Sequence, residues 1–239
     1  MHIRFSLREQ AWWVALPALL ACATPAHALN VFACEPEWAA LTRELAGDQA
    51  TVYTATHALQ DPHLVQAKPS LIAAVRNADL VVCTGAELEV AWLPVLLRQA
   101  GNPKVQPGRP GYFEAASSVR MLDVPTRLDR ADGDVHAEGN PHIQTDPRNI
   151  GLVAVSLAHR LSQVDPTQAR TYETRLADFN RRWGVALQRW SQDAASLKGT
   201  SIVVQHQGFP YLENWLGLKQ VAALEPKPGI EPSSSHLSA

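Results

Sequence analysis

Three histidines share a sequence context that suits metal binding. His63 lies in QDPHLVQAKPS, His142 in GNPHIQTDPRN and His206 in IVVQHQGFPYL. Each follows a helix breaker or a strand-like run and precedes a helix start, so each is predicted in a loop. Neutral imidazole nitrogens are ligands that suit zinc. Loops that leave the carboxyl ends of parallel strands meet in one crevice, so these imidazoles are expected to converge there. A loop histidine is also commonly solvated, and no CxxC or HExxH motif accompanies these three.

The elements that must position these loops alternate between strands and helices. Short apolar runs predict strands at 30–33, 51–54, 79–83 and 119–122. Helical patterns lie between them, over about 36–46, 68–78 and 87–100. This alternation is typical of β-α units around a parallel sheet.

A long helix is predicted over residues 166–197. Asp146-Pro147 and Asp165-Pro166 both look like an N-cap aspartate followed by proline at the first helical position. The second of these helices would run for about 45 Å, which suits a spine between two lobes. Its apolar side chains recur at spacings of three and four and are expected to pack in the core: Tyr172, Leu176, Phe179, Trp183, Leu187 and Trp190.

A second, smaller lobe follows the long helix. Strands are predicted at 200–205 and 220–224, with a helix at 210–218 between them. We therefore predict an α/β fold with two lobes, in which parallel β-sheets are flanked by helices and joined by one long rigid spine helix. Two strands make a poor independent sheet, so the second lobe is expected to be incomplete. The predicted division is a signal peptide at 1–28, an N-terminal metal-binding lobe at 29–164, the spine at 165–198 and a partial C-terminal lobe at 199–239.

The first residues resemble a secretory signal. Arg4 and Arg8 precede the apolar run AWWVALPALLACA, and Ala26 and Ala28 occupy the small-residue positions before a cleavage point. The apolar run is short for a spanning helix, which needs about 20 apolar residues. This pattern predicts export to the periplasm with cleavage after Ala28. Lipid anchoring at Cys22 is an alternative, since LLAC loosely matches a lipoprotein box.

Cleavage would leave two cysteines, Cys34 and Cys83, at the ends of strand-like runs. In an oxidising compartment they could form a disulfide, and two buried free thiols are the alternative.

The net charge of −2, from 21 basic and 23 acidic residues, comes with no basic run, which argues against nucleic acid as a partner.

Several motifs in this order resemble the solute-binding proteins of zinc and manganese ABC importers. They are QDPH with KPS, ADLVVCTGAELE with WLP, GNPHIQTDPRN, VDPTQARTY and VVQHQGFPYL, and they run from about Leu29 to the last residues. The resemblance implies two α/β lobes joined by one long helix, with a metal ion between them. It also implies an ABC permease of the inner membrane as partner, with a periplasmic metallochaperone as a further one.

The resemblance implies a ligand set as well. His63 and His142 match the two first-lobe ligands, and His206 matches the first ligand of the second lobe. Manganese-type members have a carboxylate where His206 stands, so an imidazole there favours zinc over manganese. The usual fourth ligand, an aspartate late in the second lobe, is expected beyond the last residue of this sequence. Three histidines with water, or a borrowed carboxylate, would then complete the site.

His136 and Glu138 lie in the acidic stretch before His142, where zinc-type relatives carry a metal-capturing loop. We hypothesise that residues 132–138 collect zinc for the main site; a solvated surface loop is the alternative.

The leading prediction is a zinc-binding transport protein and not an enzyme. The alternatives are a zinc hydrolase with an open coordination position, an adhesin with structural zinc, and a non-functional fragment.

Overall fold

The structure is a computed structural model that describes residues 28–128, 136–227 and 229–238. The predicted signal peptide, Cys22 and the first part of the 132–138 loop lie outside the described residues. None of the helices in the described ranges has the length and apolar character needed to cross a membrane.

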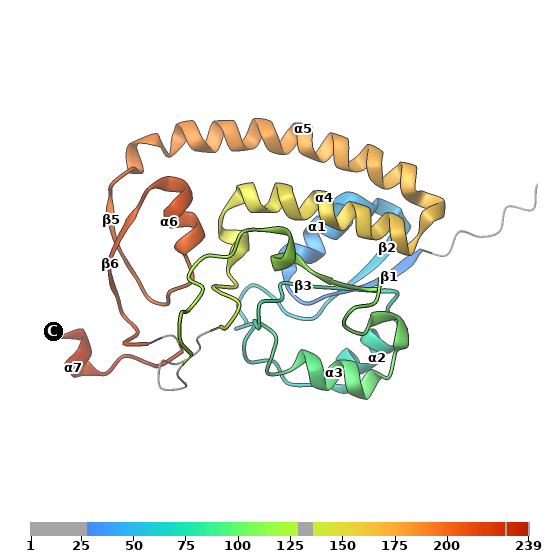
Figure 1. The fold of residues 1–239 in the computed structure, drawn as a ribbon, viewed down its shortest axis with the longest axis horizontal. Coiled ribbons are helices and arrows are strands. Elements are labelled where there is room, and N and C mark those ends of the chain that lie inside the picture. The colour runs from blue at the N-terminus through green and yellow to red at the C-terminus, as the bar shows by residue number, and fades with distance from the viewer. Residues whose placement is uncertain (1–27, 129–135, 228, 239) are drawn as a thin grey trace, which may run out of the picture.

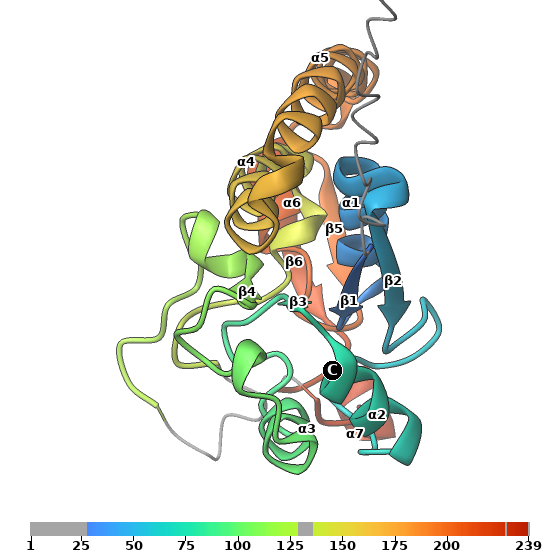
Figure 2. The same ribbon diagram turned by 90° about the vertical axis from the view of Figure 1, so that its right-hand side faces the viewer.

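The first lobe is built on one parallel sheet whose strands follow the order β2-β1-β3-β4 (Figures 1 and 2). Strand β3 is buried along its whole length, because helices cover both faces and a parallel sheet covered in this way favours continuous apolar runs. The strands are β1 (Leu29–Ala33), β2 (Ala50–Thr54), β3 (Leu80–Cys83) and β4 (Tyr112–Glu114).

Two helix pairs cover the two faces of this sheet. Trp38 of α1 and Leu157 of α4 belong to one buried cluster, and Val75 of α2 and Leu96 of α3 belong to the other. The helices are α1 (Pro36–Ala46), α2 (Pro69–Asn77), α3 (Leu93–Ala100) and α4 (Pro147–Val164). This layering leaves the carboxyl ends of the strands free to carry loops.

Three local predictions were wrong. The fourth strand is Tyr112–Glu114 instead of 119–122, because this segment is the one that pairs with β3. Helix α3 begins at Leu93 and not at residue 87, which places Pro94 in the first turn, where a missing N–H costs nothing. Asp165 does not cap the backbone of the next helix; its carboxylate accepts hydrogen bonds from the hydroxyls of Thr167 and Tyr172. The predicted cap at Asp146 is confirmed, since its side chain accepts the backbone N–H of Arg148.

The long helix α5 (Ala169–Asp193) connects the two lobes along the top of Figure 1. Its 25 residues span about 38 Å, and 3-10 turns flank it. Its first half packs on the first lobe: Tyr172 and Phe179 are buried, and the indole of Trp183 donates to the carbonyl of Pro147. Trp190 in the second half is exposed. The aromatic stripe is therefore core packing in the first half of the helix.

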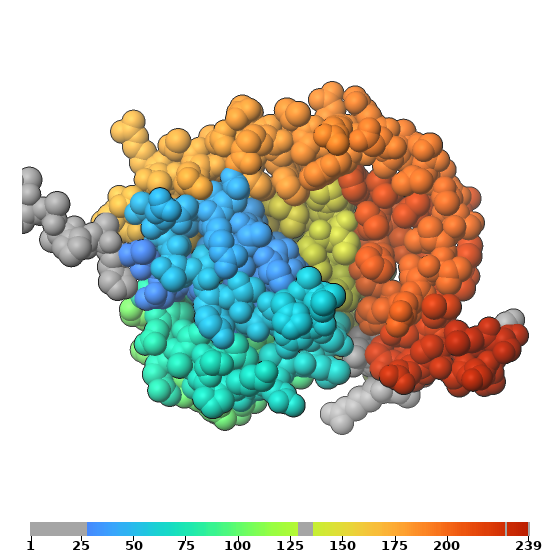
Figure 3. Space-filling model, turned by 180° about the vertical axis from the view of Figure 1, so that it is seen from behind, coloured from blue at the N-terminus to red at the C-terminus, as the bar shows by residue number. Residues whose placement is uncertain are grey.

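The second lobe is small. Strands β5 (Ser201–Val204) and β6 (Lys219–Ala223) form a two-stranded parallel sheet, with α6 (Pro210–Leu216) between them in sequence and α7 (Ser234–Leu237) beyond. Seen from behind, the red second lobe lies beside the blue and cyan first lobe, with α5 above both (Figure 3). The predicted α/β class with its long connecting helix is confirmed, and the division at residues 164 and 198 stays a prediction.

Candidate metal centre

The structure brings His63, His142 and His206 together from three loops. One ring nitrogen of each lies within 4.8 Å of those of the other two, and the ring centroids are 5.5–6.0 Å apart. His63 follows β2, His142 precedes α4 and His206 follows β5. A tetrahedral zinc ion holds nitrogen ligands at about 2.0–2.1 Å, so small side-chain rotations would bring these nitrogens to one ion.

A carboxylate orients the ring of His63. The Nδ1 atom lies 2.8 Å from Oδ1 of Asp61, which also accepts the backbone N–H of His63 at 2.9 Å. This contact directs Nε2 inward, where it is buried and has no hydrogen-bond partner among the residues that the structure describes. The indole of Trp92 fixes the loop by donating to the carbonyl of Pro62. An inward nitrogen with its opposite nitrogen held by a carboxylate is the arrangement of metal-ligating histidines.

The same arrangement recurs at His206 in the second lobe. Its Nδ1 lies 2.8 Å from Oε2 of Glu225, and that oxygen also accepts the backbone N–H of Gly229. Gly208, two residues on, leaves room beside the rings: a Cβ there would lie 3.4 Å from His206 and 3.5 Å from His142. A larger side chain at position 208 would therefore fill the space between the two imidazoles.

His142 is held by its backbone. Its N–H donates to the side chain of Asn140, and its carbonyl accepts the hydroxyl of Thr145. Burial, together with the neighbouring imidazoles, lowers the pKa of His142 to about 3. The ring is therefore neutral at every physiological pH, which is the state that binds a metal ion.

Hydrogen bonds join the two lobes beside these rings. The side-chain amide of Asn140 donates to the carbonyl of Gln207, and the hydroxyl of Tyr211 donates to the carbonyl of Asn140 at 2.8 Å. The same hydroxyl accepts the N–H of Leu122. Segments that are some 70–90 residues apart in sequence are thus connected at the site.

His136 lies against the three histidines, whereas Glu138 points elsewhere. The ring of His136 stacks on that of His63, with centroids 5.4 Å apart. Glu138 is exposed and lines a separate pocket, together with Glu87. A carboxylate oxygen of Glu87 accepts the N–H of Ala137 at 2.5 Å, which ties this segment to the end of β3.

Cys34 and Cys83 form a disulfide in the structure, with their Cα atoms 4.8 Å apart. The neighbouring Glu35 is buried and accepts a hydrogen bond from the hydroxyl of Thr84. The sequence analysis did not identify the two carboxylates that contact the histidines, Asp61 and Glu225. Asp61 could have been found, because it lies two residues before His63. Glu225 lies 19 residues from His206, and no local pattern connects the two.

Comparison with known proteins places the chain in a family. A model of the family described as "Zinc-uptake complex component A periplasmic" matches residues 31–239. The chain belongs to this family. Its members are solute-binding proteins and not enzymes. The resemblance inferred from the sequence motifs is therefore confirmed.

The relatives of the chain include both zinc and manganese proteins. It is 26% identical over 201 residues to the zinc-binding lipoprotein AdcA of Streptococcus pneumoniae serotype 4, covering 82% of this chain and 39% of the relative. It is 25% identical over 179 residues to the manganese ABC transporter substrate-binding lipoprotein PsaA of Streptococcus anginosus, covering 71% and 55%. The chain thus spans about two fifths to one half of the length of these relatives.

A solved structure titled "Crystal structure of ZnuA" has the same fold. The TM-score is 0.73 at 24% identity, and the match covers 88% of this chain and 75% of that one. At this identity the likeness concerns the fold alone.

Proposed function

We propose that this chain is the metal-binding part of a periplasmic protein that captures zinc and delivers it to an ABC-type permease. The observation that carries the proposal is the buried Nε2 atom of His63, which has no hydrogen-bond partner in the described part of the chain and faces the rings of His142 and His206. A buried polar atom without a partner is costly, and a metal ion would satisfy it. His63, His142 and His206 are the proposed ligands.

The ligand chemistry favours zinc over manganese. All three proposed ligands are imidazoles, and the two carboxylates at the site, Asp61 and Glu225, each contact a histidine Nδ1. Nitrogen ligands suit zinc, whereas manganese prefers carboxylate and water oxygens. Three imidazoles leave a fourth coordination position, which water or a nearby carboxylate would fill.

The site lies between the lobes, which suits a binding protein. Two proposed ligands come from the first lobe and one from the second, so a shift of either lobe or of its loop would open the ligand shell. The inner-membrane permease is the proposed recipient, with a periplasmic metallochaperone as a further partner. The signal peptide predicted at 1–28 supports this location.

We also propose that His136 helps to capture zinc, with Glu138 as a weaker contributor. The stack of His136 on His63 supports this role, because an ion held by His136 would lie next to the main site. Deleting residues 132–138 is expected to slow zinc uptake more than it lowers equilibrium affinity. Unchanged uptake kinetics in stopped-flow measurements with a fluorescent chelator would contradict it.

The test of the main proposal is a competition titration. The purified chain is titrated with zinc, and in parallel with manganese, against a chromophoric chelator. We expect one zinc ion per chain and much weaker binding of manganese. The variants His63→Ala, His142→Ala and His206→Ala should each lose at least about 100-fold in zinc affinity. Removing a ligand should cost more than removing the carboxylate that orients it.

The matched control is His159→Ala, which removes an exposed histidine of α4. It should bind zinc as the unchanged chain does. If a ligand variant that keeps its circular dichroism spectrum also keeps its zinc affinity, that residue is not a ligand. Tighter binding of manganese than of zinc would overturn the proposed cargo.

A further inference from the structure

A second group of metal-binding side chains lies at the carboxyl ends of β1 and β3, away from the three histidines. Ligand atoms of Cys34, Cys83 and Glu89 all lie within 4.8 Å of one another, and all three side chains are buried. Because Ala33 pairs with Val82 in the parallel register, the two cysteines that follow are neighbours across the strands. In the structure they are joined as a disulfide.

Glu35 lies next to this cluster, in contact with Glu89. Its Oε2 accepts the hydroxyl of Thr84 at 3.1 Å, whereas its Oε1 is buried and has no hydrogen-bond partner within the described ranges. The side chain is only 2% exposed. Burial raises the pKa of Glu35, and the adjacent carboxyl of Glu89 contributes to the rise. Two buried carboxyl groups side by side need a proton or a cation between them.

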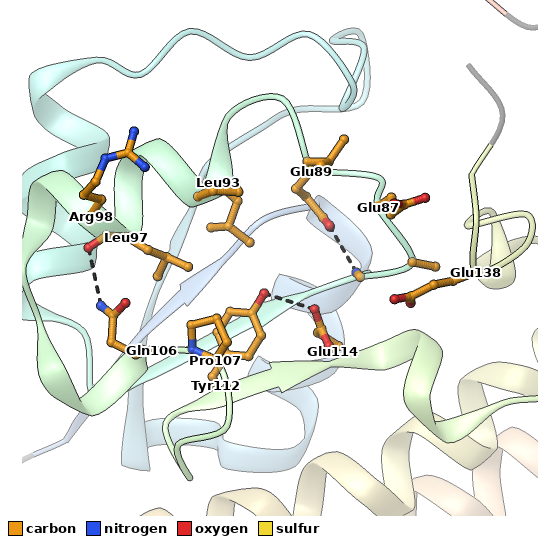
Figure 4. A pocket seen from close by; sticks show the side chains of 14 residues that line it. Glu87, Glu89, Leu93, Leu97, Arg98, Gln106, Pro107, Tyr112, Glu114 and Glu138 are labelled. Carbon is orange, nitrogen blue, oxygen red and sulfur yellow. Dashed lines mark hydrogen bonds between the residues drawn. The ribbon is translucent and has the colours of Figure 1, made fainter. Parts of the chain in front are cut away.

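An acidic pocket reaches this cluster at Glu89. Glu89 lines a cavity of about 320 Å³, and Glu87, Glu114 and Glu138 line it as well (Figure 4). Glu89 accepts the backbone N–H of Gly85, and Figure 4 shows Glu87 and Glu138 at the same end of the pocket as Glu89. A divalent cation could therefore approach Glu89 through a pocket that carries negative charge.

We propose that the dithiol form of this chain binds one zinc ion between the thiolates of Cys34 and Cys83 and the carboxylates of Glu89 and Glu35. Two sulfur and two oxygen ligands suit four-coordinate zinc. The negative charge of the group is stabilised by the N–H groups of Thr84 and Gly85, which donate to Glu89, and by the N-terminus of α1 directly after Glu35.

The Cys34–Cys83 disulfide would be reduced by a second molecule that carries a dithiol. The reductant donates two electrons and two protons, the bond between the sulfurs of Cys34 and Cys83 breaks, and the reductant becomes a disulfide itself. Zinc then displaces the two thiol protons and the proton shared by Glu35 and Glu89. The disulfide and the bound zinc ion exclude each other, so zinc should protect the thiols from oxidation. This site shares no ligand with the three histidines.

The experiment uses cobalt, because thiolate ligands give Co²⁺ an intense near-ultraviolet charge-transfer band that imidazole ligands do not. The chain with His63→Ala and His142→Ala, which lacks the histidine site, is refolded in a phosphine reductant without oxygen and titrated with Co²⁺. One equivalent with a thiolate band is expected, displaced by zinc. The oxidised chain should show no band.

Two variants test the ligands. Cys83→Ser should lose most of the thiolate band of bound Co²⁺, and Glu89→Gln should weaken Co²⁺ binding at least about tenfold. The control Glu138→Gln changes a residue of the same pocket and should bind Co²⁺ as the chain without this substitution does. A second readout is thiol alkylation, which zinc should slow in the reduced chain. The proposal is overturned if the folded, reduced chain shows no thiolate band with Co²⁺. It is also overturned if zinc leaves the rate of thiol alkylation unchanged. If reduction unfolds the chain, zinc must restore its circular dichroism spectrum, and failure to do so overturns it equally.

Discussion

Glu89→Gln is expected to remove a pH-dependent loss of stability. The carboxyl of Glu89 is 3% exposed, accepts the N–H groups of Thr84 and Gly85 and lies beside Glu35. Burial raises its pKa from 4.5 to about 7. The folded chain therefore keeps a proton over a pH range in which the unfolded chain has released it.

The sign and size of the effect follow from linkage. Because the folded-state pKa is raised, the stabilising contribution is complete below about pH 4.5 and is lost as the pH rises to about 7. Each pH unit in this window is worth about 1.4 kcal/mol, so the free energy of unfolding should fall by about 3 kcal/mol across it. A glutamine cannot ionise, so its variant lacks this dependence on pH.

The assay is urea unfolding of the metal-free, disulfide-bonded chain from pH 4.5 to pH 8.5. The free energy of unfolding of Glu89→Gln, relative to the unchanged chain, should rise by about 3 kcal/mol between pH 4.5 and pH 7 and stay level above. The control Glu138→Gln removes an exposed carboxyl from the same pocket and should follow the unchanged chain. If the curves for Glu89→Gln and the unchanged chain stay parallel, the buried-carboxyl argument is wrong.

Further predictions concern the histidine site and the contact between the lobes. Asp61→Asn and Glu225→Gln should each lower zinc affinity about 10- to 100-fold in the chelator titration, because each carboxylate orients a proposed ligand; unchanged affinity would show that the ring needs no such partner. Gly208→Val should weaken zinc binding at unchanged thermal stability, since the new methyl groups enter the space between two imidazoles. Tyr211→Phe should lower the free energy of unfolding by about 1–3 kcal/mol, because the N–H of Leu122 loses its acceptor; an unchanged urea midpoint would contradict this.

Much of the framework could be predicted from local patterns. The apolar run ending at Cys83 and the stripe on the long helix carry the periodicity of a buried strand and of a one-sided helix, so both were found within a few residues. The strand at Tyr112–Glu114 was missed because it has three residues, too few for a pattern, and is defined by pairing with β3. The start of α3 was placed too early, because the apolar pattern continues through the turns before Leu93.

The sequence by itself determined the residue types that can bind zinc and the loops that carry them, since helix breakers and strand ends are local features. Only the tertiary structure decided which side chains meet. Glu225 became the partner of His206, and Glu35 came to lie beside Glu89, because the packing of parallel strands brings separate segments together. Such contacts depend on packing across the sheet and between the lobes, which leaves no periodic trace in the chain.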